Sequence, residues 1–468
     1  MFDILVAEDG KSWRDICKEA FDIAGYTCDF AANASDAIEK LETDKYRLVC
    51  VNLKLVDYGP GTALLHRLDS HFPDMPVMLV TGYFAGSLAE INERVNRLQK
   101  RYPNIKKVLL KGNPDEPVDA FVDALLEGVQ DLLEYPSGRV VSWLHLSDLH
   151  LKDKSYQQDK VLRQLLEDVK ETGWRPDLVV VTGDITFSAR PDQYRLASDF
   201  FDKLLEITGL PKDALFLVPG NHDVDWGKLD KYRKAVFSEP SEVIEFFHDI
   251  EAQEARRYVF SKFESYAEFV NTYLVNQNGE PIRSFDEDHY FYVHTLDIEA
   301  GRIVILGLNS AWASALRFDF EEKKADDEGH LWLGEPQIDT ALRLAEECKA
   351  DIVIALMHHP FEWLEKCDCD WVEHPMRKKC SVILHGHLHE AIVGRHIEPG
   401  NDVVILGAGT TYEKRDHRNC YCYVSLDLAA RKGTAYLRRY SPRRGGGWVP
   451  DALSYPAAGS DKVSFDIP

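Results

Sequence analysis

Five short apolar segments in the second part of the chain each end in Asp, Asn or His residues. One of them, LFLV at residues 215–218, stops at a Pro-Gly pair and leads into Asn221, His222 and Asp223. Apolar runs of this length that end in Pro and Gly are typical of buried parallel strands. Ligands of open α/β sheets bind beyond the carboxyl ends of such strands. The pattern therefore predicts an α/β fold with a functional site at the strand ends.

The other four segments end in the same way. They are residues 140–146 before SDLH (147–150), 177–181 before TGD (182–184), 351–356 before MHHP (357–360), and 381–384 before HGHLH (385–389). One histidine after a strand is usually a hydrogen-bonded loop residue, but five such ends at one topological position indicate a shared site. Their oxygen and nitrogen donors suit Mn, Fe, Zn or Ni, and no thiolate is among them. In the D-x-H and H-x-H spacings, alternate residues of an extended stretch face one side and can reach one ion.

The order of these motifs, DLH, GD, GNHD, HHP and HGHLH, resembles the calcineurin-like metallophosphoesterase superfamily over residues 140–412. The resemblance implies a four-layer α/β/β/α sandwich with a helical insertion and two metal ions that share a carboxylate. Carried over to this chain, the bridging carboxylate is Asp184, and His359 lies behind the site. The full set of implied metal ligands is Asp148, His150, Asp184, Asn221, His358, His387 and His389.

The same resemblance implies catalytic roles for His222 and Asp223. His222 would stabilise the transition state or protonate the leaving oxygen, and Asp223 would hold its imidazole in one tautomer. The attacking group would be a hydroxide that bridges two divalent transition-metal ions, with Mn or Fe favoured over Zn or Ni.

The expected reaction is hydrolysis of a phosphate ester, and of a diester rather than a monoester. A metal-dependent nuclease and a phosphomonoesterase or protein phosphatase are the enzymatic alternatives. A partner-docking protein with a vestigial catalytic domain is the alternative of another class, and the seven competent ligand positions argue against it.

Residues 1–135 alternate short apolar runs with longer amphipathic ones, which predicts a doubly wound parallel sheet. We expect strands at residues 3–7, 46–51, 77–81 and 107–110, and helices at residues 12–24 and 119–133. This part resembles a response-regulator receiver domain. Glu8-Asp9, Thr81 and Lys111 match the acidic pair, the Thr or Ser and the Lys of that family.

The phosphoacceptor position of the receiver family falls on Asn52, in NLKLVD. A neutral amide cannot attack phosphorus as a carboxylate does, and it removes one charge that would hold a divalent ion. We therefore expect a pseudo-receiver that mediates dimerisation or docks a protein partner. Asp57 is a conceivable substitute acceptor, but a solvated loop residue is the plainer interpretation.

The chain has 468 residues, which exceeds one ordinary domain. Turn formers at residues 136–139, PSGR, follow a helical segment and predict a linker between domains at residues 1–135 and 140–468. Residues 226–288 include stretches with helical spacing, and a helical cap or insertion is expected there.

The formal net charge of −23 argues against a general nucleic-acid binder or a protein of anionic membrane surfaces. Nucleic acid is therefore expected only as a substrate. The start of the chain has no secretory pattern, and no apolar run approaches the ~18 residues of a membrane span, so a cytoplasmic protein is expected.

Two smaller features leave alternatives open. The nine cysteines fit reduced thiols, although the Cys-x-Cys pairs at 367/369 and 420/422 leave a structural zinc site as an alternative. A basic cluster near the end of the chain consists of Arg438, Arg439, Arg443 and Arg444. It predicts a solvated turn or, alternatively, a contact with substrate phosphate.

Overall fold

In the computed structural model, the chain forms two compact units, Met1–Val140 and Val141–Pro468. The structure describes residues 2–52, 60–72, 75–81, 97–102, 104–111, 119–134, 140–152, 155–228, 237–298, 301–319, 324–398, 401–414, 418–456 and 460–468. The predicted linker at 136–139 and Asp57 lie outside the described residues.

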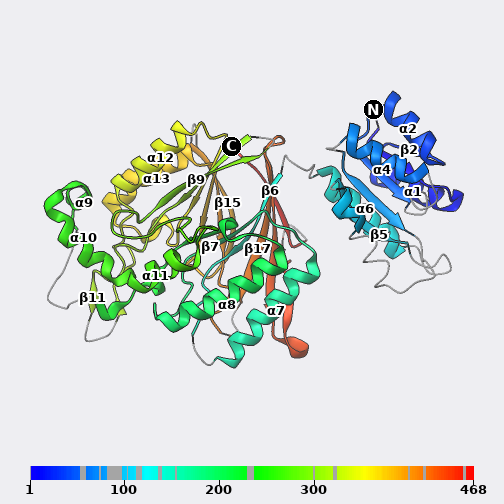
Figure 1. The fold of residues 1–468 in the computed structure, drawn as a ribbon. Coiled ribbons are helices and arrows are strands. Elements are labelled where there is room, and N and C mark those ends of the chain that lie inside the picture. Colours follow the sequence, from blue (N-terminus) through cyan, green and yellow to red (C-terminus); the bar gives the residue numbers. More distant parts are fainter. Residues whose placement is uncertain are drawn as a thin grey trace. The chain divides into compact units, whose positions relative to one another are not determined.

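The first unit is a five-stranded parallel sheet in the order β2-β1-β3-β4-β5 (Figure 1). Its elements are β1 (Ile4–Ala7), α1 (Lys11–Ala24), β2 (Cys28–Ala31), α2 (Ala34–Thr43), β3 (Leu48–Asn52), α4 (Pro60–His71), β4 (Val77–Thr81), β5 (Ile105–Leu110) and α6 (Asp119–Glu134). Alternate strand residues pack on opposite faces, one against α1 and α6 and the other against α2 and α4. This confirms the predicted doubly wound sheet.

Strand β2 was not among the predicted strands. Its four residues, CDFA, lie at the edge of the sheet and three of them are half-buried, so they form no apolar run.

The second unit contains two sheets, in the orders β19-β18-β17-β6-β7-β8, with β20 beside β18, and β15-β16-β14-β13-β10-β9. The strands are β6 (Val140–Leu146), β7 (Leu178–Thr182), β8 (Leu215–Val218), β9 (Tyr292–Ile298), β10 (Gly301–Gly307), β13 (Ile352–Leu356), β14 (Val382–His385), β15 (Ala391–Glu398), β16 (Asn401–Ala408), β17 (Cys420–Asp427), β18 (Lys432–Ser441), β19 (Gly447–Pro450) and β20 (Lys462–Asp466). A separate two-stranded ribbon pairs β11 (Phe318–Asp319) with β12 (Lys324–Ala325).

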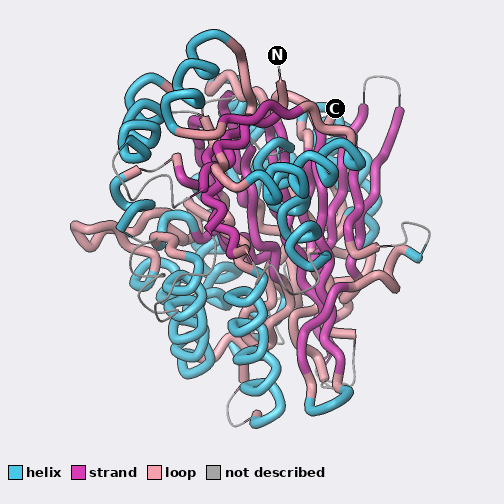
Figure 2. The backbone as a smooth tube through the Cα atoms, turned by 90° about the vertical axis from the view of Figure 1, so that its right-hand side faces the viewer, coloured by secondary structure: helices cyan, strands magenta, loops and turns pink. Residues whose placement is uncertain are grey.

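Helices cover the outer faces of both sheets (Figure 2). One outer layer contains α7 (Tyr156–Thr172) and α8 (Pro191–Thr208), and the other contains α12 (Glu335–Glu347) and α13 (Lys366–Lys379). In β7, Val179 and Val181 face the helices, whereas Leu178 and Val180 pack between the sheets. The predicted four-layer α/β/β/α sandwich is therefore confirmed.

Three α-helices lie in the described part of the predicted insertion. They are α9 (Pro240–His248), α10 (Gln253–Phe260) and α11 (Glu264–Tyr273). Helix α11 contacts α8, and α9 contacts α12, so the insertion joins both helical layers. Its role as a cap remains a prediction. Among the helices of the described ranges, none has both the length and the apolarity to cross a membrane.

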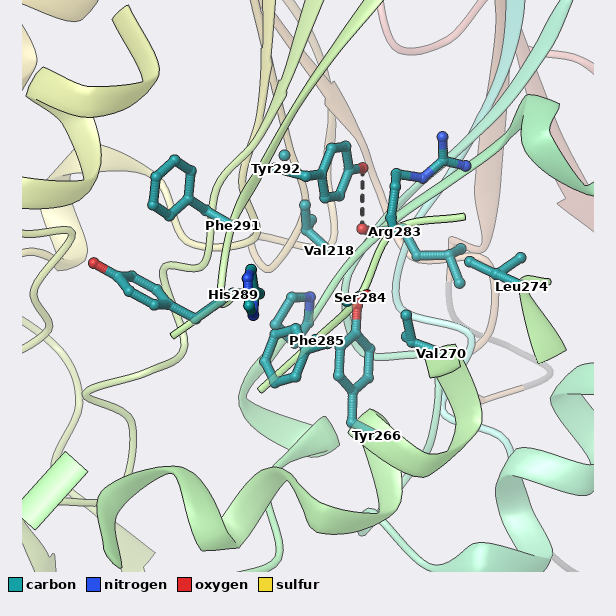
Figure 3. A pocket seen from close by; sticks show the side chains of 14 residues that line it. Val218, Tyr266, Val270, Leu274, Arg283, Ser284, Phe285, His289, Phe291 and Tyr292 are labelled. Carbon is teal, nitrogen blue, oxygen red and sulfur yellow. Dashed lines mark hydrogen bonds between the residues drawn. The ribbon is translucent and has the colours of Figure 1, made fainter. Parts of the chain in front are cut away.

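Strand β8 is an edge strand of its sheet, and carbonyl groups on its unpaired side accept hydrogen bonds from side chains of other segments. Arg283 Nη2 donates to the carbonyl of Leu215 at 2.5 Å, and the Tyr292 hydroxyl donates to that of Leu217 at 3.1 Å. Figure 3 draws the second bond as a dashed line, among the residues that line a small cavity beside the end of β8. An edge strand exposes unpaired backbone groups, so these donors fix the segment that leads to Asn221.

Neither Arg438 of the basic cluster nor the cysteines belong to the candidate site of the described residues. Arg438 is buried and its Nε donates to Asp168 Oδ2 at 2.9 Å, so it is neither a solvated turn residue nor a phosphate contact. All nine cysteines are free thiols, and none belongs to a candidate metal group of the described residues.

Candidate metal centre

The strand ends of both sheets supply one cluster of polar side chains. Strands β6, β7 and β8 are parallel neighbours, as are β13 and β14, so their carboxyl ends lie at the same edges. After β8 the chain forms a 3₁₀ turn, η2 (Asn221–Asp223). All seven predicted ligands lie within this cluster, linked by the contacts described next.

A first group of donors consists of Asp148, His150 and His389, whose donor atoms lie within 4.8 Å of one another. Oδ1 of Asp148 lies 3.2 Å from Nε2 of His389 and 3.8 Å from Nε2 of His150. Asp148 and His150 are buried, whereas His389 is half-buried and reachable from solvent.

A second group surrounds Oδ1 of Asn221. Nε2 of His358 and Nε2 of His359 each lie 3.1 Å from this oxygen, and Nδ1 of His387 lies 3.2 Å from Nε2 of His358. His359 was expected behind the site, but the structure places its Nε2 beside His358 and His387 as a further candidate ligand.

The carboxylate of Asp184 lies between the two groups. Its Oδ2 is 3.4 Å from Nε2 of His358 and 3.9 Å from Nδ1 of His150. The other oxygen accepts a hydrogen bond from the backbone N–H of His222 at 2.7 Å. This bond fixes the carboxylate so that one oxygen faces both groups.

The lone pairs of these groups converge in a way that requires cations. Nδ1 of His358 lies 2.7 Å from the carbonyl of Thr182, which can only accept, so this nitrogen carries the hydrogen. Nε2 therefore faces Asn221 Oδ1 and Asp184 Oδ2, two acceptors that attract either a proton or a metal ion to this nitrogen. In addition, Asp148 Oδ1 and His150 Nδ1 are buried without a well-aligned hydrogen-bond partner. Buried acceptors in this arrangement fit divalent metal ions.

The carboxylates of the cluster raise the pKa values of two histidines, whereas burial lowers the pKa values of His150 and His387 to about 4 and about 3. Burial alone would lower the pKa of His358, but Asp184 and Asp148 raise it to about 9. Burial likewise opposes protonation of His389, and its contacts with Asp148 and Glu413 raise its pKa to about 9. The carboxylates therefore attract positive charge to both groups.

The backbone at the candidate ligands is strained. Asp148, His150, Asp184, His387 and His389 all have φ between 45° and 67°, the left-handed region that non-glycine residues rarely adopt. Such residues cluster at functional sites, where the surrounding structure holds them in place. Gly386 is also required, because a Cβ atom there would lie 1.9 Å from Ser147 Oγ and 2.9 Å from Asp148 Oδ2.

His222 lies beside the first group, but Asp223 does not orient it. Nδ1 of His222 lies 2.7 Å from the carbonyl of Phe187, so that carbonyl fixes the imidazole. Asp223 points into the protein and is fully buried. Its carboxylate accepts hydrogen bonds at 3.0–3.1 Å from the backbone N–H groups of Ile185, Thr186 and Gly220 and from the Tyr194 hydroxyl. The sequence-based role of Asp223 is corrected accordingly: it ties the end of β7 to the end of β8.

Sequence reasoning missed one residue of the site, Glu413. Oε2 of Glu413 lies 3.0 Å from Nδ1 of His389, on the side of the ring away from Asp148. Ser310 follows β10, and its Oγ accepts hydrogen bonds from the backbone N–H groups of His358 and His359. No motif marks Glu413, whereas the apolar run before Ser310 does mark its position.

Comparison with known families is decisive for the second unit. The calcineurin-like phosphoesterase family matches residues 142–391, more than half of the chain. The chain belongs to this family. Calcineurin-like phosphoesterases use divalent metal ions, and the groups described above could hold them. Residues 4–134 match the response regulator receiver domain, so the chain joins a receiver domain to a phosphoesterase domain.

Individual relatives match shorter parts of the chain. A glycerophosphodiester phosphodiesterase of Enterobacter lignolyticus is 29% identical over 85 residues, 17% of this chain and 28% of that protein. A cAMP/cGMP dual specificity phosphodiesterase of Mycobacterium tuberculosis is 35% identical over 95 residues, 19% of this chain and 29% of that protein. An uncharacterized metallophosphoesterase-like protein of Bacillus subtilis is 24% identical over 265 residues, 54% of this chain and 49% of that protein. The chain thus spans less than half the length of each of these relatives.

Among solved structures, a CheY-like receiver domain protein of Methanospirillum hungatei is 25% identical. The match covers 29% of this chain and 94% of the chain of that protein, with a TM-score of 0.23.

Proposed function

We propose that the phosphoesterase unit hydrolyses phosphodiesters with two divalent metal ions. One ion would be held by Asp148, His150, Asp184 and His389, and the other by Asp184, Asn221, His358 and His387. The observation that carries this proposal is the position of Asp184 Oδ2, within 3.4 Å of His358 Nε2 and 3.9 Å of His150 Nδ1. A single carboxylate oxygen that faces two groups of donors is suited to bridge two ions.

Metal ions bound there would lower the pKa of water and offset the charge of the phosphate. The chain itself contributes a proton donor. Because Nδ1 of His222 donates to the Phe187 carbonyl, Nε2 of the protonated ring would supply the proton that goes to the leaving oxygen. The His222 and His150 rings lie 4.7 Å apart between centroids, so this proton is held beside the first group.

A diester is favoured over a monoester for two reasons. Two of the matched relatives are named as phosphodiesterases, although each match covers less than a fifth of this chain. A diester also has one negative charge on its phosphate, where a monoester has up to two, and the strongly acidic chain disfavours the more highly charged substrate.

The test uses purified protein loaded with manganese, with its metal content measured by mass spectrometry. It is offered bis(p-nitrophenyl) phosphate, p-nitrophenyl phosphate and linear DNA. Faster turnover of the diester is expected. Preference for the monoester would contradict the diester assignment, DNA cleavage would favour the nuclease, and no turnover with metal bound would favour a vestigial site.

We also propose that the receiver unit acts as a docking or dimerisation module that aspartyl phosphorylation does not switch. Asn52 stands at the end of β3, where the receiver family has its phosphoacceptor, and its amide is hydrogen-bonded within the unit. Light scattering of the full chain, with and without acetyl phosphate, tests this proposal: the mass should be independent of the phosphodonor.

A further inference from the structure

Phe187 stands beside the candidate metal centre with 45% of its surface exposed. Its ring centroid lies 5.4 Å from that of His222 and 6.5 Å from that of His150. A phenyl ring gains free energy when it leaves water, so an exposed ring at the mouth of a polar site indicates contact with a ligand.

Hydrogen bonds fix the backbone that carries this ring. The N–H of Phe187 donates to the carbonyl of Leu151 at 3.0 Å, and the carbonyl of Phe187 is bound by His222 Nδ1. The preceding residue, Thr186, donates its N–H to the buried carboxylate of Asp223 at 3.1 Å. A ring held in this way loses little conformational entropy when a ligand binds.

A cation lies against the same ring. Nζ of Lys152 is 4.8 Å from the ring centroid of Phe187, so a flexible side chain lies over one face of the ring. A planar aromatic group of a ligand would take the place of this ammonium and stack on the ring in an offset arrangement. The ring of Trp226 also lies 6.4 Å from the imidazole of His222, so two aromatic side chains lie near the proton donor.

We propose that Phe187 forms the subsite for the leaving group of the phosphodiester, and that this leaving group carries a planar aromatic ring, as a nucleoside does. The proposal rests on the proposed function, because it takes His222 as the residue that faces the leaving oxygen. In the reaction, the oxygen of water bonds to phosphorus and the bond from phosphorus to the leaving oxygen breaks. The leaving oxygen takes a proton, and the products are a phosphomonoester and an alcohol.

The experiment compares two methyl phosphodiesters, one of 2-phenylethanol and one of 2-cyclohexylethanol. The two leaving groups are similar in size and basicity and differ in planarity. For the manganese-loaded protein, kcat/KM should be about tenfold higher for the phenylethyl diester, as stacking on an aromatic side chain implies. Phe187→Leu should bring the ratio close to one, and Phe187→Tyr should keep it.

A matched control is Trp371→Leu, which removes an aromatic side chain that is 60% exposed on α13. This variant should leave the ratio of the two diesters unchanged. A ratio near one in the unmodified protein, or a ratio that persists in Phe187→Leu, would overturn the proposal.

Binding provides a readout that does not depend on turnover. Calorimetry of the manganese-loaded protein with phenylphosphonate and cyclohexylphosphonate should give tighter binding of the phenyl compound, and Phe187→Leu should weaken that binding about tenfold. If neither diester is hydrolysed, the proposed function fails, and this titration alone decides the role of Phe187. Equal binding of both phosphonates would contradict that role.

Discussion

Nδ2 of Asn52 donates a hydrogen bond to Oε1 of Glu8 at 3.0 Å in the receiver unit. The same nitrogen lies 3.1 Å from Oδ1 of Asp9, and the ammonium of Lys111 pairs with the other oxygen of Glu8. Glu8, Asn52 and Lys111 are all buried. An uncharged amide and one lysine therefore satisfy the acidic pair that would otherwise attract a divalent cation.

The first prediction follows from this contact. Asn52→Asp would bring three carboxylates together, whose repulsion favours a bound Mg²⁺ ion. We expect acetyl phosphate with Mg²⁺ to label residue 52 of this variant and to leave the receiver unit of the unmodified chain unlabelled, as measured by peptide mass spectrometry. Asn278→Asp, which adds the same charge at an exposed site, is the control. Labelling anywhere in the unmodified receiver unit would contradict the pseudo-receiver interpretation.

The second prediction separates proton transfer from metal binding. His222→Ala should lower kcat by about 10²- to 10⁴-fold, the range typical of a lost general acid, with the metal content unchanged. Asp184→Asn should instead lower the metal content, because it removes charge from the oxygen that faces both groups. Metal analysis and diester kinetics on the same preparations check this contrast, with the exposed His289→Ala as control. A loss of metal in His222→Ala would contradict the assigned role.

The third prediction concerns Glu413. Its contact with His389 Nδ1 keeps the other ring nitrogen directed at Asp148, and carboxylates in this position hold metal-binding histidines in place. Glu413→Gln should weaken metal binding about 10- to 100-fold, measured by competition with a chelator. Glu390→Gln changes the same charge next to His389 in sequence, at an exposed residue, and should have no such effect. Equal affinities of the two variants would rule out a positioning role for Glu413.

The sequence predicted the donor residues and the strands that lead to them because both are local properties. Apolar runs followed by Asp, Asn or His mark the ends of β6, β7, β8, β13 and β14. These ends can be recognised without knowing how the rest of the chain packs. The direction of each side chain at a tight turn is not local. Within η2, His222 turns outward and Asp223 inward, because Tyr194 and Thr186, 29 and 37 residues away, provide donors for a buried carboxylate.

The same limit explains the other omissions. Adjacent histidines 358 and 359 are equivalent in sequence, and only the strand geometry puts both Nε2 atoms at Asn221. The carbonyl of Phe187 and the carboxylate of Glu413 act through contacts with residues 35 and 24 positions away, and neither belongs to a motif.

The fourth prediction concerns the buried Lys262, which fixes the insertion to the segment after β10. Its Nζ donates to the carbonyls of Trp312 at 2.7 Å and Ser314 at 2.6 Å, and the side chain is fully buried. Burial lowers the pKa of Lys262 from 10.5 to about 7, because water no longer solvates the ammonium.

Stability should therefore depend on pH through this lysine. Between about pH 7 and 10.5, the unfolded chain binds a proton at Lys262 that the folded chain does not bind. The contribution of Lys262 to stability therefore rises with pH in this range, and it is lost as the pH falls through 7. From pH 7 to pH 9 the unmodified protein should gain about 2 kcal/mol relative to Lys262→Met, in which the titrating group is absent. Urea unfolding of the phosphoesterase unit at several pH values, for both proteins, measures this difference. Parallel pH profiles would show instead that Lys262 stays protonated in the folded state, held by the two carbonyls that it binds.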